Sequence, residues 1–232
     1  MGAFPRSIML AAASLVVPGL ATAQLCLGVP AANGAVALAA RAGIAWDETT
    51  YDGGATVNLP GPLSASGAYS HGMLYPLHRP ANGVSGGLAY EVSRWGMSVC
   101  PVANAQYERL SISGYDASHT YSWTTLSLGV TLGRTLASWR EAYLVAHGGP
   151  RLIYFRSVYR DEVPQPSADG PEGNPSLRPR EIGEFHEFGG HAGLTLGRGR
   201  LYLDAVVDGT SHGRWEPAYT FSLGIVLGSE DS

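Results

Sequence analysis

The sequence contains no lysine, and all fifteen of its basic residues are arginine. Charged residues make up only 15% of the chain, well below the roughly 25% of soluble domains. The net charge of −4 argues against nucleic acid as a partner. Beyond the N-terminal segment there is no run of about 18 apolar residues, so no membrane-spanning helix is expected there. The whole chain is 45% hydrophobic and holds 31 glycines.

The N-terminal segment, residues 1–23, has the pattern of a secretory signal peptide. It carries one arginine, an apolar run and the small-residue ending Ala-Thr-Ala, which predicts cleavage before Gln24. A membrane anchor is the alternative, but the apolar run is short and is interrupted by Pro18 and Gly19. We therefore expect an exported mature chain, residues 24–232, that forms one domain.

The stretch WTTLSLGVTLGR, residues 123–134, alternates without a break between leucine or valine and small polar residues. A period of two predicts a strand with one apolar face. A soluble sheet would carry charges on its other face, but here that face has only hydroxyls and glycines. The pattern therefore predicts leucines that face lipid and a small polar face inside a narrow barrel.

Eight segments show strand patterns, and long and short connections alternate between them. Helical bundles and βαβ folds do not produce this rhythm, which is typical of an up-and-down barrel. We expect residues 47–83, with four prolines, and residues 161–181 to be long external loops, and a bulge at Pro150. The predicted strands are residues 35–46, 84–93, 97–112, 123–134, 140–159, 182–196, 201–208 and 216–228.

This pattern, with the signal peptide and the apolar, aromatic last strand AYTFSLGIVLG, resembles the small eight-stranded outer-membrane β-barrel proteins of the OmpA-like and OmpX-like class. The resemblance implies an all-β fold, an eight-stranded antiparallel up-and-down transmembrane β-barrel, porin-like in architecture and located in the outer membrane. Barrels of this class usually end on an aromatic residue. This chain ends on residues 227–232, LGSEDS, so assembly would have to use the Tyr219, Phe221 and Leu227 face.

With leucines outward, the inward positions form a polar network of both signs. Eight strands leave an interior only just wide enough for side chains, and buried charges must pair. A closed, salt-bridged lumen is the simplest interpretation, and a narrow pore is the alternative. The predicted lumen residues are Arg41, Glu91, Asn104, Gln106, Glu108, His147, Arg151, Glu187, His191 and Asp204.

The two cysteines, Cys26 and Cys100, fall near the same predicted barrel end. An oxidising compartment permits a disulfide between them, and we expect one in preference to two free buried thiols.

All five tryptophans fall near predicted strand ends, which predicts two aromatic girdles at the membrane interfaces. These residues are Trp46, Trp95, Trp123, Trp139 and Trp215.

Five arginines at the predicted outer end suit contacts to lipopolysaccharide phosphates, although solvated loop charges would look the same. They are Arg156, Arg160, Arg178, Arg180 and Arg214. Outer-membrane lipid and lipopolysaccharide are thus the expected partners, with a possible extracellular ligand on the loops at residues 47–83 and 161–181.

The sequence favours a structural or surface-interaction role without catalysis, cofactor or metal. No histidine pair has metal-ligand spacing. Outer-membrane lipid deacylases and palmitoyltransferases are similar in size and fold, and Ser211, His212 and Glu216 are the nearest candidates for such chemistry. A soluble periplasmic ligand-binding barrel is a further alternative, but it would need charged outward faces.

Overall fold

A computed structural model describes the protein at residues 34–45, 48–74, 79–94, 96–113, 118–162, 178–211 and 217–228. The predicted signal peptide lies outside these residues. Within them, no helix has the length and apolar character needed to cross a membrane.

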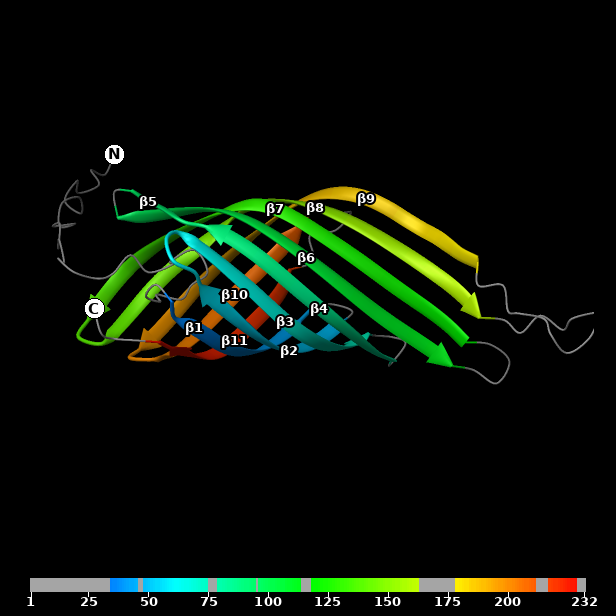
Figure 1. The fold of residues 1–232 in the computed structure, drawn as a ribbon, viewed down its shortest axis with the longest axis horizontal. Coiled ribbons are helices and arrows are strands. Elements are labelled where there is room, and N and C mark those ends of the chain that lie inside the picture. The colour runs from blue at the N-terminus through cyan, green and yellow to red at the C-terminus, as the bar shows by residue number, and fades with distance from the viewer. Residues whose placement is uncertain are drawn as a thin grey trace, which may run out of the picture.

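Every regular element in the described residues is a β-strand (Figure 1). In chain order the strands are β1 (Val36–Ile44), β2 (Glu48–Asn58), β3 (Leu63–Leu74), β4 (Arg79–Tyr90), β5 (Val92–Arg94), β6 (Met97–Ser113), β7 (Ser118–Trp139), β8 (Ala142–Glu162), β9 (Arg178–Arg198), β10 (Leu201–Thr210) and β11 (Ala218–Leu227).

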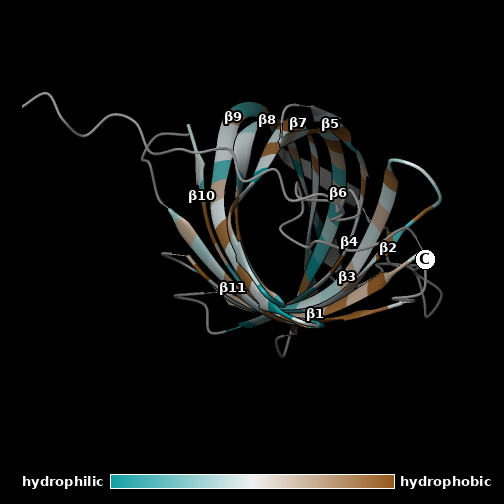
Figure 2. Ribbon diagram, turned by 90° about the vertical axis from the view of Figure 1, so that its left-hand side faces the viewer, coloured by the Kyte–Doolittle hydropathy of each residue, from teal (hydrophilic) through white to brown (hydrophobic). Residues whose placement is uncertain are grey.

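The strands form one closed antiparallel ring, seen end-on in Figure 2. Neighbours in the chain pair with each other, β1 pairs with β11, and β4 pairs with β6. The short β5 also pairs with β6 and continues the line of β4 past Glu91. Because β5 continues the line of β4, the two count as one strand of the barrel, which then has ten strands. The all-β barrel prediction is confirmed, and the prediction of eight strands is wrong.

The error lies in residues 47–83, which were expected to form an external loop. They contain β2, β3 and the start of β4. Glycine, alanine, serine and threonine dominate β2 and β3, so neither strand shows the leucine alternation that marks the others. Pro60 and Pro62 fall in the turn between them, where a missing N–H costs no ladder hydrogen bond.

The register around the ring measures how far the strands tilt. Following paired residues from Ala42 through β2, β3, β4 and β6 leads to Ser122 on β7. Following them the other way, through β11, β10, β9 and β8, leads to Arg134 on the same strand. The two arrival points are twelve residues apart. This stagger corresponds to strands tilted by roughly 40° to the barrel axis.

The outward face carries a continuous apolar band. Leu128 is 64% exposed and Phe188 is 71% exposed, and further leucines, valines and aromatic residues are exposed on other strands. The prediction that the leucines of residues 123–134 point outward is confirmed. At the outer end the band is bordered by the exposed tyrosines Tyr51, Tyr69, Tyr107 and Tyr219.

Pro150 does not cause the expected bulge. It lies opposite Gly190 in an unbroken β8–β9 register, and the β7–β8 register is the same on both sides of it. The register shifts instead between Thr135 and Ala137 in the β7–β8 pairing and between Ser157 and Val158 in the β8–β9 pairing. Next to the proline, a Cβ on Gly149 would come within 1.9 Å of the Val130 carbonyl oxygen. The two backbones therefore approach closely beside the proline.

We expect the substitution Leu128→Arg to block assembly of the barrel in a membrane. It places a charge in the middle of the apolar band, which costs roughly 2–4 kcal/mol at the bilayer midplane. The measurement is the gel mobility of the membrane fraction before and after boiling, because folded barrels resist SDS until heated. Ser127→Ala, on the inward neighbour, should leave the heat-dependent shift intact. Normal assembly of the Leu128→Arg protein would overturn the assignment of faces.

Candidate functional site

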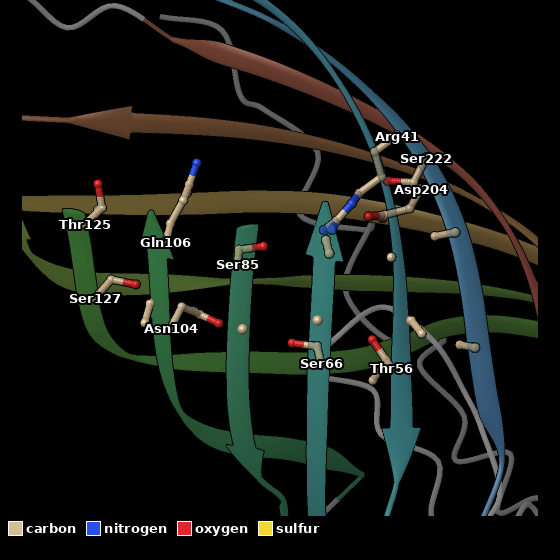
Figure 3. Close-up of a pocket in the computed structure, with 18 of the residues that line it drawn as sticks. Arg41, Thr56, Ser66, Ser85, Asn104, Gln106, Thr125, Ser127, Asp204 and Ser222 are labelled. Carbon is tan, nitrogen blue, oxygen red and sulfur yellow. The ribbon is translucent and has the colours of Figure 1, made fainter. Parts of the chain in front are cut away.

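The polar interior of the barrel is the candidate site. The inward positions of successive strands are fixed by alternation and by register, and the ten predicted lumen residues all lie on inward-facing positions. Figure 3 shows part of this interior, with Arg41 and Asp204 close together and Asn104 and Gln106 side by side on β6.

A buried histidine and carboxylate pair lies on one wall. His147 Nε2 is 2.9 Å from Asp204 Oδ1, and the Thr195 hydroxyl donates to the same oxygen at 2.9 Å. Thr195 is fully buried and His147 is 8% exposed. The pair lies above Gly193, where a Cβ would come within 2.5 Å of the His147 ring. Asp204 therefore has two donors from neighbouring strands, which suits a structural brace.

Two arginines pair with carboxylates that were absent from the predicted network. Arg41 on β1 binds Asp52 on β2 through its Nε atom, and Arg151 Nη2 lies 2.8 Å from Asp208 Oδ1 on β10. Asp52 was missed because β2 was taken for a loop. Asp208 shares the parity of Asp204 on β10, so alternation alone could have identified it.

Further polar contacts link the walls of the lumen. His191 Nε2 lies 3.4 Å from the Thr131 hydroxyl, and its ring centre is 6.2 Å from that of His147. Near the turn end, Glu91 accepts hydrogen bonds from the hydroxyls of Ser93 and Ser98. Among the described residues, no group of three or more histidine, cysteine, aspartate or glutamate side chains is arranged to hold a metal ion.

The lumen is packed in its turn-side half. Tyr202 lies across Gly224, Tyr143 lies across Gly197, and in each case an added Cβ would come within 2.2 Å of the tyrosine ring. The inward side chains at this level are buried: Ala37, Asn58, Ser64, Ala89, Ser98, Cys100, Thr131, Val145, Thr195 and Tyr202. Rings resting on glycines fill part of the cross-section here, on the side of β8 to β11. Ser64, Ala89, Thr131 and Tyr202 at this level also line cavities.

The outer half of the lumen is hollow. Asn104 and Gln106 point inward yet are exposed, and a cavity of about 470 Å³ lies between the wall β1–β4 and the wall β7–β10. A second cavity of about 270 Å³ shares Arg41, Asn104 and Asp204 with it. The space arises because β2, β3 and β4 contribute small side chains, among them Gly54, Thr56, Ser66, Ala68 and Ser85.

The predicted lipopolysaccharide arginines are only partly placed. Arg156 and Arg160 are exposed on the outward face near the outer end of β8. Arg109 on β6 is also exposed on that face, and sequence reasoning missed it. Arg178 and Arg180 belong to β9, but the structure does not describe their side chains, and Arg214 lies outside the described residues.

The tryptophan prediction needs one correction. Trp139 is exposed near the turn end of β7, whereas Trp123 faces inward opposite Glu108. β7 begins at Ser118, earlier than predicted, so Trp123 is not at the strand end and its parity places it inside. Trp46, Trp95 and Trp215 lie outside the described residues.

Two other predictions fall partly outside the described residues. Cys100 is 1% exposed on the inward face, but Cys26 is not described, so the disulfide stays a prediction. Ser211 is described, and its hydroxyl accepts a hydrogen bond from the Phe188 N–H at 3.2 Å. Its proposed catalytic partners His212 and Glu216 are not described, nor are residues 163–177 of the predicted loop at residues 161–181.

We expect Asp204→Ala to lower the free energy of unfolding by about 1–3 kcal/mol, because it leaves buried donors of His147 and Thr195 without their acceptor. Urea titration of the barrel in lipid vesicles, followed by tryptophan fluorescence, measures the change. Thr56→Ala, a cavity-lining change elsewhere in the lumen, is the control and should have little effect. Equal stability of the two variants would show that the Asp204 contacts do not brace the barrel.

Comparisons with known proteins identify the fold and no family. No protein-family model matches the sequence, and no curated protein matches it either. Among solved structures, the translocator domain of the autotransporter NalP from Neisseria meningitidis superposes with a TM-score of 0.51. It is 12% identical, and the match covers 84% of this chain and 88% of that one.

Two other matches have lower scores. The N-terminal β-barrel domain of Pseudomonas aeruginosa OprF has a TM-score of 0.37 at 12% identity, covering 84% of this chain and 98% of that one. The KdgM porin has a TM-score of 0.37 at 8% identity, with 83% and 99% covered. By the similarity to the NalP domain, the chain has the fold of an outer-membrane β-barrel.

Proposed function

We propose that this protein is an outer-membrane barrel that holds a four-stranded wall above the membrane for interactions at the cell surface. We call this part, the outer ends of β6 to β9, the projecting wall. One observation carries the proposal. β6 to β9 have 17 to 22 residues, whereas β1 to β4, β10 and β11 have 9 to 12. Figure 1 shows the long strands extending well beyond the others.

The strand lengths fit a membrane. A tilted strand needs roughly 9–11 residues to cross a bilayer, so the short strands are just long enough to span it. The long strands have about 6–12 residues more than that. β9 extends outward past the end of β10, which stops opposite Gly189. The apolar band and its tyrosine border support the outer membrane as the location, with the termini in the periplasm.

We also propose that the lumen is closed to ions and that the protein is not an enzyme. Tyr143 and Tyr202 narrow the turn-side half on the side of β8 to β11, which supports closure. The hydroxyl of Ser211 is engaged with the Phe188 N–H, which favours a structural role for it. The second candidate is a narrow pore, because the outer cavities are lined by polar groups.

Wild-type barrel in a planar lipid bilayer should show no steady conductance, because ordered side chains block the turn-side half. The double variant Tyr143→Ala, Tyr202→Ala is the positive control, since removing both rings should open a passage. Single-channel recording measures both. A steady, cation-preferring current through the wild-type protein would overturn the closed lumen and favour the pore.

Phosphate-bearing lipid of the outer leaflet is the partner we propose for the outward arginines. Arg109, Arg156 and Arg160 lie on the outward face of the projecting wall, and Tyr107 of the tyrosine border lies in the same register row as Arg156. Glu184 is opposite Arg156 and reduces the charge there. Guanidinium groups just above an aromatic border are at the depth of the lipid phosphates.

The double variant Arg109→Gln, Arg160→Gln should bind lipopolysaccharide at least about tenfold more weakly, because charge-assisted hydrogen bonds to phosphate are lost. Native mass spectrometry of detergent-solubilised barrel with added lipopolysaccharide measures the bound fraction. Arg134→Gln is the matched control, since Arg134 is an exposed arginine on the outward face of β7 near the turn end. Unchanged binding by the double variant would remove lipopolysaccharide as the partner of this surface.

A further inference from the structure

We propose that the inner face of the projecting wall binds a small organic cation, such as a quaternary ammonium compound. This inference rests on the proposed surface role, since it names the ligand of the same wall. The site consists of the aromatic residues Tyr121, Trp123, Phe155, Tyr159 and Phe185 with the carboxylates of Glu108 and Glu187.

Five aromatic rings share the inner face of three neighbouring strands. Tyr121 and Trp123 on β7 have ring centres 6.5 Å apart, and Tyr121 lies 4.8 Å from Tyr159 on β8. Phe155 on β8 stacks on Phe185 on β9 at 4.7 Å. Alternation along β7 places Tyr121 and Trp123 on the same side as Ser127, which lines the cavity. The rings therefore form two clusters on the same inner face above the lumen, one of Tyr121, Trp123 and Tyr159 and one of Phe155 and Phe185.

Two carboxylates flank this surface, and neither has a cationic partner among the described residues. Glu108 on β6 lies directly opposite Trp123 in the register. Glu187 follows Phe185 by two residues on the same face of β9, and its Oε2 atom is buried with no hydrogen-bond partner. The described ion pairs of the lumen use Asp52, Asp204 and Asp208, and none reaches either glutamate.

The aromatic rings border the larger cavity of the lumen. Thr125 lies in the register row of Phe155, opposite Gln106, and both Thr125 and Gln106 line the 470 Å³ cavity. The cavity therefore begins where the aromatic rows end. β10 ends at Thr210, opposite Gly189 of β9. β4 and β3 continue the row of Glu108 and Trp123 with the small residues Gly83 and Ser70, so these described strands leave room beside the rings.

The chemistry selects the charge of the ligand. Aromatic faces attract cations within about 6 Å of the ring centre, and an unpaired carboxylate beside the rings adds a Coulombic term that an anion would oppose. A neutral apolar ligand would gain from the rings alone and would leave Glu108 and Glu187 without a counter-charge. A positively charged organic group satisfies the rings and the carboxylates together.

The test is a saturation-transfer NMR titration of the full barrel in a maltoside detergent, which carries no quaternary ammonium group. The probes are choline and its neutral carbon isostere. We expect choline to bind at least about fivefold more tightly than the isostere, as a cation–π and carboxylate site requires. Glu108→Gln and Trp123→Ala should each lower choline affinity by a similar factor.

Matched controls separate this site from general effects. Glu184→Gln removes an exposed outward carboxylate of β9, and Trp139→Ala removes an exposed outward tryptophan of β7. Both should bind choline like wild type. The heat-dependent gel shift confirms that each variant is folded, and Glu108→Gln preserves side-chain shape if Trp123→Ala does not assemble.

Equal binding of choline and its isostere, no binding of either, or unchanged affinity in folded Glu108→Gln would overturn the proposal. Different results would overturn the proposed surface role. A barrel that assembles and is closed to ions but does not bind choline loses only the cation site. A protein that does not enter the membrane loses the surface role and the cation site together.

Discussion

The rest of this structure depends on one constraint, which is that lipid offers the backbone no hydrogen-bond partners. Inside lipid every N–H and C=O must find a partner within the protein, so a sheet is viable only if it closes on itself. Closure joins β1 to β11 and β4 to β6. Strand tilt, register and the division into two faces all follow from it, because a shift of one residue would turn every leucine inward.

Closure of the sheet creates a wide interior that side chains have to fill. A ring of ten strands is too wide to be filled evenly by medium-sized side chains, and this chain fills it unevenly. Tyrosine rings over Gly197 and Gly224 fill one end, while small residues of β2 and β3 face the charged wall of β8 to β10 and leave a hollow. Packed rings and accessible space thus occupy different parts of the same lumen.

Sequence alternation predicted the faces well and the strand count badly, for one reason. Alternation is visible where an apolar side chain must contact lipid, as at Leu128, and it correctly put Asp204 inside. β2 and β3 carry few large apolar residues, so they produced no signal, and the partnership of Arg41 with Asp52 was lost with them. The position of Trp123 in the sequence was not enough to place it. Its placement in an aromatic girdle depended on where β7 begins, which only the register of β6 to β8 fixes.

The four long strands follow one another in the chain, and each pairs antiparallel with the next. Residues added in matched numbers to the outer ends of two such neighbours would pair with each other and leave every contact in the bilayer unchanged. The height and chemistry of the outer part can therefore change during evolution independently of the membrane-embedded ring. Selection for new surface properties would act there first, while the ring tolerates little drift.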